Sequence, residues 1–263
     1  MNDHQEHLEQ TGEKSRVARR SIYFLPNLIT TAALYFGFFA IVQATKGRFE
    51  LAASAVFAAM VLDALDGRVA RLTKTTSDFG AEYDSLSDVI AFGLAPALVV
   101  YDWALYSMNK LGWLVAFIYV ACTALRLARF NIRTVMDKRY FQGLPSPAGA
   151  AVLASWVWLI ESHGFDAGYL RYVTWLLTLL VAGAMVSNIK FRSFKDMDLK
   201  GRVPFFALLP VVLFFVLLAF DAPLVLFVIF FGYFVSGPLL KALRVRKIRR
   251  RRKRIQAARE QGS

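Results

Sequence analysis

Cysteine and histidine are nearly absent from this sequence, which has one cysteine and three histidines among 263 residues. A single cysteine cannot form a disulfide within the chain. Cys122 lies in an apolar run, where we expect a small buried side chain. The first 20 residues are polar and lack both an apolar core and a small-residue cleavage site. We therefore expect no cleavable signal peptide.

Charged residues are scarce over long stretches of the chain. Hydrophobic residues make up 57% of the sequence and the mean hydropathy is +0.44, whereas soluble domains are about half apolar. The excess falls in runs of about 20 residues, the length that an α-helix needs to cross a hydrocarbon core roughly 30 Å thick. The pattern predicts an all-α integral membrane protein, a bundle of about eight transmembrane helices near 27–45, 50–72, 84–105, 111–131, 146–163, 169–189, 203–220 and 222–240.

Acidic residues are outnumbered by basic ones, and the basic residues are unevenly distributed between the two sides of the predicted bundle. The net charge is +13, and with both termini inside, 28 of the 32 Lys and Arg residues fall on one side. Basic loop residues favour the cytoplasmic side of a membrane. We therefore predict cytoplasmic N- and C-termini, a polar head at 1–20, a transmembrane domain at 21–243 and a basic tail at 244–263.

The basic tail contains the most concentrated charge in the sequence. Residues 244–254 read RVRKIRRRRKR, with nine basic residues in eleven, and they directly follow an apolar segment. A basic cluster in that position is typical of contact with anionic lipid headgroups on the cytoplasmic face. Nucleic-acid binding is the weaker interpretation, because no aromatic residues are interleaved for base stacking.

Four aspartates interrupt the apolar pattern between residues 61 and 97. Asp63 and Asp66 end the second apolar run, while Asp84 and Asp88 open the third. Acidic residues at the edge of a membrane helix are costly and are commonly functional. Helical spacing places each pair on one face of its helix. Because a short connection joins the two helices, we expect them to be antiparallel neighbours whose carboxylates converge at the cytoplasmic boundary.

Carboxylates gathered in this way repel each other and require cations. Ligand sets made only of oxygen suit Mg²⁺ or Mn²⁺, and such ions commonly hold substrate phosphates. Gly67 and Gly80 have no side chain, which allows a ligand to approach the backbone closely. Arg71 could hold a phosphate oxygen. The alternative is that single aspartates serve as helix caps, as Asp78 or Asp84 could.

The same residues carry a resemblance to a known family. DALDGRVAR, eight further residues and then GAEYDSLSD match every fixed position of D-x-x-D-G-x-x-A-R-x8-G-x3-D-x3-D, and the chain resembles the CDP-alcohol phosphotransferase family there. The resemblance implies that 21–243 is a CDP-alcohol phosphotransferase domain. It also implies a homodimer and a bacterial inner membrane location, with the active site on the cytoplasmic side.

Individual roles follow from this resemblance. It implies a metal site for two Mg²⁺ or Mn²⁺ ions, with Asp88 also the general base, formed by Asp63, Asp66, Asp84 and Asp88. It implies contacts to the CDP-diacylglycerol substrate from Gly67, Ala70, Arg71, Ser77 and Gly80. The segment PNLI resembles the family's stretch before its first helix, which lines the same site, and comprises Pro26, Asn27, Leu28 and Ile29. Pro-Asn is also an ordinary helix start, with Asn as the N-cap.

The implied reaction needs a base to take the proton of the acceptor hydroxyl as that oxygen attacks phosphorus and CMP leaves. No histidine is placed for nucleophilic attack, since His4 and His7 lie in the polar head and His163 is expected at the opposite membrane face. The alternative is an enzyme of the same family with another acceptor alcohol, such as glycerol phosphate, inositol phosphate or choline. A transporter is a remote alternative, because no repeated halves with paired broken helices are visible.

Three further segments resemble the branch of the family that uses L-serine as the acceptor. They read CTALRLARFNIR at 122–133, FQGLPSPAG at 141–149 and FRSFKDMDLKGR at 191–202. Arg126 and Arg129 share a helix face, and either can hold the serine carboxylate or form an ion pair within the protein. Asn131 can bind the amino group or, as we favour, cap the helix end. Ser146 is a further candidate contact to serine.

Overall fold

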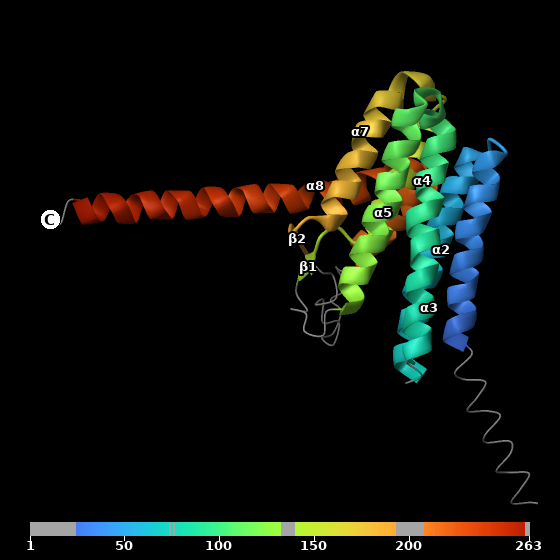
Figure 1. Ribbon diagram of the computed structural model, residues 1–263, viewed down its shortest axis with the longest axis horizontal. Helices are drawn as coiled ribbons and strands as arrows, with labels where there is room; N and C mark the ends of the chain where they lie inside the picture. Colours follow the sequence, from blue (N-terminus) through green and yellow to red (C-terminus); the bar gives the residue numbers. More distant parts are fainter. Residues whose placement is uncertain (1–24, 74, 76, 133–139, 193–207, 261–263) are drawn as a thin grey trace, which may run out of the picture.

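The computed structural model describes residues 25–73, 75, 77–132, 140–192 and 208–260. Its helices stand side by side in a bundle, and the C-terminal part of α8 runs sideways away from it (Figure 1). The N-terminal helix is Leu25–Thr45. It is followed by α2 (Phe49–Thr73), α3 (Asp78–Asp88), α4 (Ala95–Val100), α5 (Lys110–Ile132), α6 (Ser146–Ser162), α7 (Ala167–Val186) and α8 (Leu208–Glu260).

The segments α3 and α4 belong to one helical rod, Asp78–Met108. Between them Val89–Leu94 is a π-helical segment, in which the amide of Ala95 donates to the carbonyl of Ile90, five residues earlier. A second π-helical segment, Tyr101–Leu105, and a 3₁₀ turn, Tyr106–Met108, complete the rod. The first π-helical segment begins at the residue after Asp88, so the acidic end of the rod is joined to its apolar end through a widened turn.

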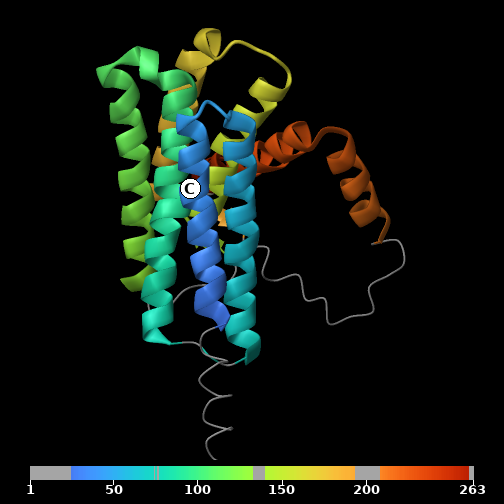
Figure 2. The ribbon, with the colours of Figure 1, turned by 90° about the vertical axis from the view of Figure 1, so that its right-hand side faces the viewer.

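Small side chains allow the central helices to approach closely. Ala52, Ala53, Ala55 and Ala59 of α2 are all buried, and so are Ala150, Ala151 and Ala154 of the adjacent α6. Within a bilayer the lipid tails are as apolar as leucine, so helices associate through close van der Waals packing, which small residues permit. Figure 2 shows the N-terminal helix standing between α2 and the rod of α3 and α4, next to this packed centre.

A short β-ribbon closes the end of α5 and α7. The strands β1 (Tyr140–Gln142) and β2 (Lys190–Arg192) pair antiparallel, with Phe141 opposite Phe191. Gly143 follows β1 with a φ of +81°, and a β-carbon there would collide with the carbonyl oxygen of Met185. Glycine is therefore required for the chain to leave the ribbon and enter α6.

The other end of the bundle is held by polar contacts among α6, α8 and the rod. Trp103 Nε1 donates to Glu161 Oε2 at 2.9 Å, and His163 Nε2 lies 3.3 Å from Asp221 Oδ2. Asp221 has non-helical backbone angles, so α8 is broken there into two helices. The α6–α7 turn beside His163 lies at the opposite end of the bundle from the start of α3 (Figure 1).

The predicted all-α class is confirmed for the described residues, apart from the two short strands. Within the described part of the chain, five helices are long and apolar enough to cross a membrane: Leu25–Thr45, Asp78–Met108, Lys110–Ile132, Ala167–Val186 and Val212–Leu243. The two predicted crossings at 203–220 and 222–240 fall largely on the two parts of the broken α8. The count of eight crossings stays a prediction, and the polar head at 1–20 lies outside the described residues.

A close contact between the N-terminal helix and the rod yields a stability prediction. A β-carbon on Gly37 of the N-terminal helix would lie 2.7 Å from the Cα of Ala91 in the rod. We expect Gly37→Ala to lower stability in detergent by about 1–3 kcal/mol, because backbone cannot yield as a side chain can. Gly183→Ala is the control, since no atom lies within 4 Å of a β-carbon there. Thermal unfolding measures both, and equal melting temperatures would show that the contact is not tight.

Candidate active site

Three of the predicted aspartates converge where α2 ends and α3 begins. Asp63, Asp66 and Asp84 each offer a carboxylate oxygen, and the three oxygens lie within 4.8 Å of one another. Asp66 is buried and the other two are half-buried. The short connection between α2 and α3 makes the two helices antiparallel, which brings together carboxylates that are about 20 residues apart in sequence.

The fourth aspartate, Asp88, joins this group from one turn further along α3. Its carboxyl group lies within hydrogen-bond reach of that of Asp63. Two carboxylates in such contact must share either a proton or a cation, because bare negative charges at that separation repel strongly. The four aspartates therefore form one electrostatic unit, called here the acidic cluster.

The donor chemistry of the acidic cluster fits a divalent cation. Mg²⁺ holds oxygen ligands at about 2.0–2.1 Å, so two oxygens on one ion lie up to about 4.2 Å apart. The oxygens of Asp63, Asp66 and Asp84 need only small movements to reach that range. None of these three carboxylates forms an ion pair with a described lysine, arginine or histidine. The described basic residues therefore do not neutralise these three carboxylates, and a divalent cation is a partner that would.

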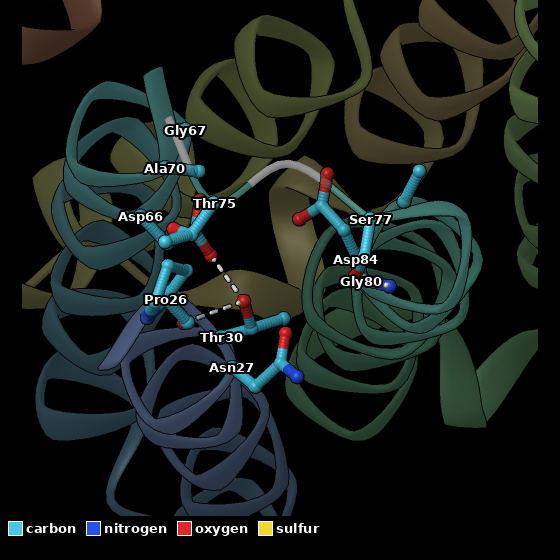
Figure 3. A pocket seen from close by; sticks show the side chains of 11 residues that line it. Pro26, Asn27, Thr30, Asp66, Gly67, Ala70, Thr75, Ser77, Gly80 and Asp84 are labelled. Carbon is cyan, nitrogen blue, oxygen red and sulfur yellow. Dashed lines mark hydrogen bonds between the residues drawn. The ribbon is translucent and has the colours of Figure 1, made fainter. Parts of the chain in front are cut away.

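A cavity of about 170 Å³ opens directly beside the acidic cluster. Figure 3 shows Asp66 and Asp84 on opposite walls of it. Eight of the residues singled out from the sequence line this cavity: Pro26, Asn27, Asp66, Gly67, Ala70, Ser77, Gly80 and Asp84. Three further lining residues, Thr30, Thr75 and Ala81, were missed by the sequence analysis.

Local structure explains how the α3 wall of this cavity is formed. Ser77 is the N-cap of α3 and its Oγ accepts a hydrogen bond from the amide of Gly80 at 3.0 Å. A β-carbon on Gly80 would lie 3.1 Å from Ser77 Oγ and 3.2 Å from Asn27 Oδ1. Any side chain at Gly80 would therefore crowd both polar groups. Gly67 faces open space, so a side chain there would have room to fill the cavity.

Thr30 connects the N-terminal helix to the acidic cluster. Its Oγ1 lies 2.7 Å from Asp66 Oδ2 and 3.1 Å from the carbonyl oxygen of Pro26. The hydroxyl has one proton and can donate to only one of these acceptors at a time. A bond to Asp66 orients that carboxylate toward the cavity. The signal was present in the sequence, because Thr30 lies one helical turn beyond Pro26 and Asn27 on the same face.

Three of the residues predicted to contact CDP-diacylglycerol do not line the cavity in this structure. Leu28 is 66% exposed, since the helix turns it toward the surroundings of the bundle. Ile29 is half-buried and Arg71 is exposed at the end of α2. Pro26 and Asn27 line the cavity, and the contacts predicted for Leu28, Ile29 and Arg71 stay predictions.

Arg126 of α5 lies near Asp88. It is close enough to Asp88 for the two charges to attract. Its Nη1 donates to Ser146 Oγ at 2.8 Å, and Ser146 is fully buried at the start of α6. The Nε of Arg126 is buried and has no hydrogen-bond partner among the residues that the structure describes. A buried guanidinium with an unused N–H group can donate a hydrogen bond to an oxygen atom of a ligand.

Arg129, one turn further along α5, is differently engaged. Its Nη2 donates to Asn188 Oδ1 at 2.6 Å and to Gln142 Oε1 at 3.1 Å, and its Nη1 donates to the carbonyl of Val186 at 3.3 Å. Arg129 therefore ties α5 to the end of α7 and to β1. Asn131 donates to Ser85 Oγ at 2.9 Å, so it links α5 to α3.

Comparison with known proteins places this site in context. The family model described as CDP-alcohol phosphatidyltransferase matches residues 23–187. The CDP-diacylglycerol–serine O-phosphatidyltransferase of Helicobacter pylori is 40% identical over 223 residues, which are 84% of this chain and 92% of that protein. The protein of that name from Bacillus subtilis is 35% identical over 172 residues, covering 65% of this chain and 92% of its own. The region matched by the family model contains both the acidic cluster and the cavity.

The Thr30–Asp66 hydrogen bond yields a metal-binding prediction. We expect Thr30→Val to weaken Mn²⁺ binding roughly 10-fold or more, because an unsupported carboxylate ligand loses its fixed orientation. The paramagnetic resonance signal of free Mn²⁺ measures the affinity. Thr45→Val is the control, since Thr45 lies at the other end of the same helix and bonds only to the carbonyl of Val42. Equal affinities in the two variants would remove Thr30 from the site.

Proposed function

Because this chain belongs to the CDP-alcohol phosphatidyltransferase family, we propose that it transfers the phosphatidyl group of CDP-diacylglycerol to the hydroxyl of L-serine, giving phosphatidylserine and CMP. Relatives bearing the name of this reaction match most of the chain. The observation that carries the proposal is the meeting of the acidic cluster with the cavity between the N-terminal helix, α2 and α3.

The aspartates supply the charge that this reaction needs. We assign Asp63, Asp66, Asp84 and Asp88 to hold two ions, Mg²⁺ or Mn²⁺. Divalent ions, when bound, offset negative charge on the transferring phosphoryl group and on the departing CMP. The residues of the cavity receive the nucleotide part of the lipid, with the two glycines allowing close approach to backbone and Ser77 and Asn27 presenting polar groups. Arg71 and the segment 26–29 stay predicted contacts.

Asp88 is the general base in this proposal. Its carboxyl group lies close to Asp63 of the acidic cluster and also close to Arg126. The hydroxyl of serine gives its proton to Asp88 as its oxygen bonds to the phosphorus that carries diacylglycerol. The phosphorus–oxygen bond to CMP breaks, and CMP leaves with the electron pair. No covalent intermediate with the protein is needed for this displacement.

Arg126 is our choice for the carboxylate of serine. Its buried Nε is unpartnered, and its Nη1 is fixed by Ser146, so the guanidinium is oriented with donor capacity to spare. Three donors of Arg129 already bond to Asn188, Gln142 and Val186. We therefore keep Ser146 as a supporting residue and assign Arg129 a structural role. Glycerol phosphate, inositol phosphate or choline as the acceptor is the alternative.

The membrane setting completes the proposal. The chain is an integral membrane protein, which we place in a bacterial inner membrane as a homodimer with its active site and both termini on the cytoplasmic side. Residues 21–243 form the catalytic domain. The basic tail at 244–263, into which α8 continues up to Glu260, binds anionic lipids of the same face.

A CMP-release assay tests the function directly. Purified protein is incubated with CDP-diacylglycerol and Mn²⁺, and we expect CMP only when L-serine is added and no EDTA is present. Asp88→Asn should lower turnover by roughly 10²–10⁴-fold, as for a lost general base, while CDP-diacylglycerol still binds. Release of CMP with another alcohol but not with serine would favour the alternative acceptors. Full turnover by Asp88→Asn would assign the proton transfer to another group.

The two arginines separate carboxylate recognition from structural support. We expect Arg126→Lys to raise the KM for serine about tenfold or more with little change in kcat, because lysine keeps the charge but loses the planar fork. Arg129→Lys is the matched control on the same helix face. It should retain the KM for serine, although it lowers thermal stability. A normal KM in Arg126→Lys would leave this arginine as an internal partner of Asp88.

A further inference from the structure

The rod that carries Asp84 and Asp88 contains an irregularity immediately beyond them. An α-helix would bond the carbonyl of Phe92 to the amide of residue 96, four residues later. Residue 96 is proline and has no amide proton to donate. The chain widens here into the π-helical segment Val89–Leu94, in which Ala95 donates to Ile90. The carbonyl of Phe92 is thereby left without its regular donor in the middle of the bundle.

Tyr119 of α5 supplies the missing donor. Its hydroxyl donates to the carbonyl oxygen of Phe92 at 3.0 Å, and its side chain is completely buried. A tyrosine hydroxyl inside a membrane bundle needs such a partner, because an unsatisfied polar group is costly there. Thr123, one turn along α5, packs within 3.3 Å of where a β-carbon on Gly93 would lie. The two side chains thus contact the widened turn from the same face of α5.

The widened turn determines which way Asp84 and Asp88 point. Each residue of an α-helix advances the chain by about 100° around the axis. The extra residue of a π turn therefore rotates the acidic end of the rod against its apolar end by a similar amount. The apolar end is fixed by the core, since Ala95, Ala97, Val99 and Val100 are all buried. The orientation of the aspartates consequently depends on whether the turn stays widened.

We propose that Tyr119 is a positioning residue for the active site: by donating to the carbonyl of Phe92 it holds the π-helical segment after Asp88, and so keeps Asp84 and Asp88 directed at the α2 aspartates. The inference rests on the proposed function for the role of Asp88, but the geometry of the turn does not. Tyr119 itself is not among the residues that line the cavity or offer a carboxylate to the acidic cluster.

The test compares two variants that disturb the turn from opposite sides. Tyr119→Phe keeps the ring and removes the hydroxyl, while Pro96→Ala restores an amide that can bond Phe92 in an α-helical turn. We expect each to lower kcat by about tenfold to a hundredfold, as for a small misplacement of reacting groups. The KM values for CDP-diacylglycerol and serine should stay within about twofold of wild type.

Two further measurements make the outcome decisive. Mn²⁺ affinity, measured without substrate, reports the aspartate orientation even if the wild-type protein proves inactive toward serine. Thr178→Val controls for stability, because Thr178 is also fully buried and donates to a backbone carbonyl, that of Thr174. A fall in kcat or in Mn²⁺ affinity, with melting temperatures no lower than that of Thr178→Val, supports positioning. Wild-type values of both, or losses that only follow unfolding, overturn it.

Discussion

Mutual repulsion among four carboxylates at one end of the bundle is the constraint around which this site is arranged. Asp63 and Asp88 are in contact, and the oxygens of Asp63, Asp66 and Asp84 lie within 4.8 Å of one another. Such crowding costs free energy unless cations or hydrogen-bond donors compensate it. Thr30 provides one donor to Asp66, and Arg126 lies beside Asp88. Divalent ions fit as the partners of the remaining negative charge, and a transferring phosphoryl group requires such ions as well.

The surrounding helices hold this unfavourable group in place by close packing. Alanines of α2 and α6 lie against each other, and Gly37 lies against Ala91. This packing leaves few alternative positions for the ends of α2 and α3, where the aspartates are. Pro96 introduces a widened turn that a straight α-helix would lack, and Tyr119 satisfies the carbonyl that the proline leaves free. The rigid packing of the apolar part of the bundle therefore fixes the orientation of the aspartates at its polar end.

Two arginines on one face of α5 illustrate how similar residues acquire different roles. Arg129 reaches three acceptors near the ends of β1 and α7. Arg126 donates to Ser146, and its buried Nε has no hydrogen-bond partner among the described residues. The two lie three residues apart, but one faces a loop region rich in carbonyl and amide oxygens and the other faces the acidic cluster. The difference is one of surroundings, since charge and side-chain geometry are the same.

The sequence by itself determined the helical class, the apolar spans and the pairing of the two aspartate faces, because these depend on spacing along a single helix. It also identified eight residues of the cavity through the motif and the Pro-Asn segment. Thr30, the exposure of Leu28 and the different partners of Arg126 and Arg129 were decided by the tertiary structure. The tertiary structure also decided the widened turn that Tyr119 contacts, although Pro96 was visible in the sequence. Each of these features depends on which helix lies opposite. A hydrogen bond between two helices produces no periodic pattern in the sequence of either helix.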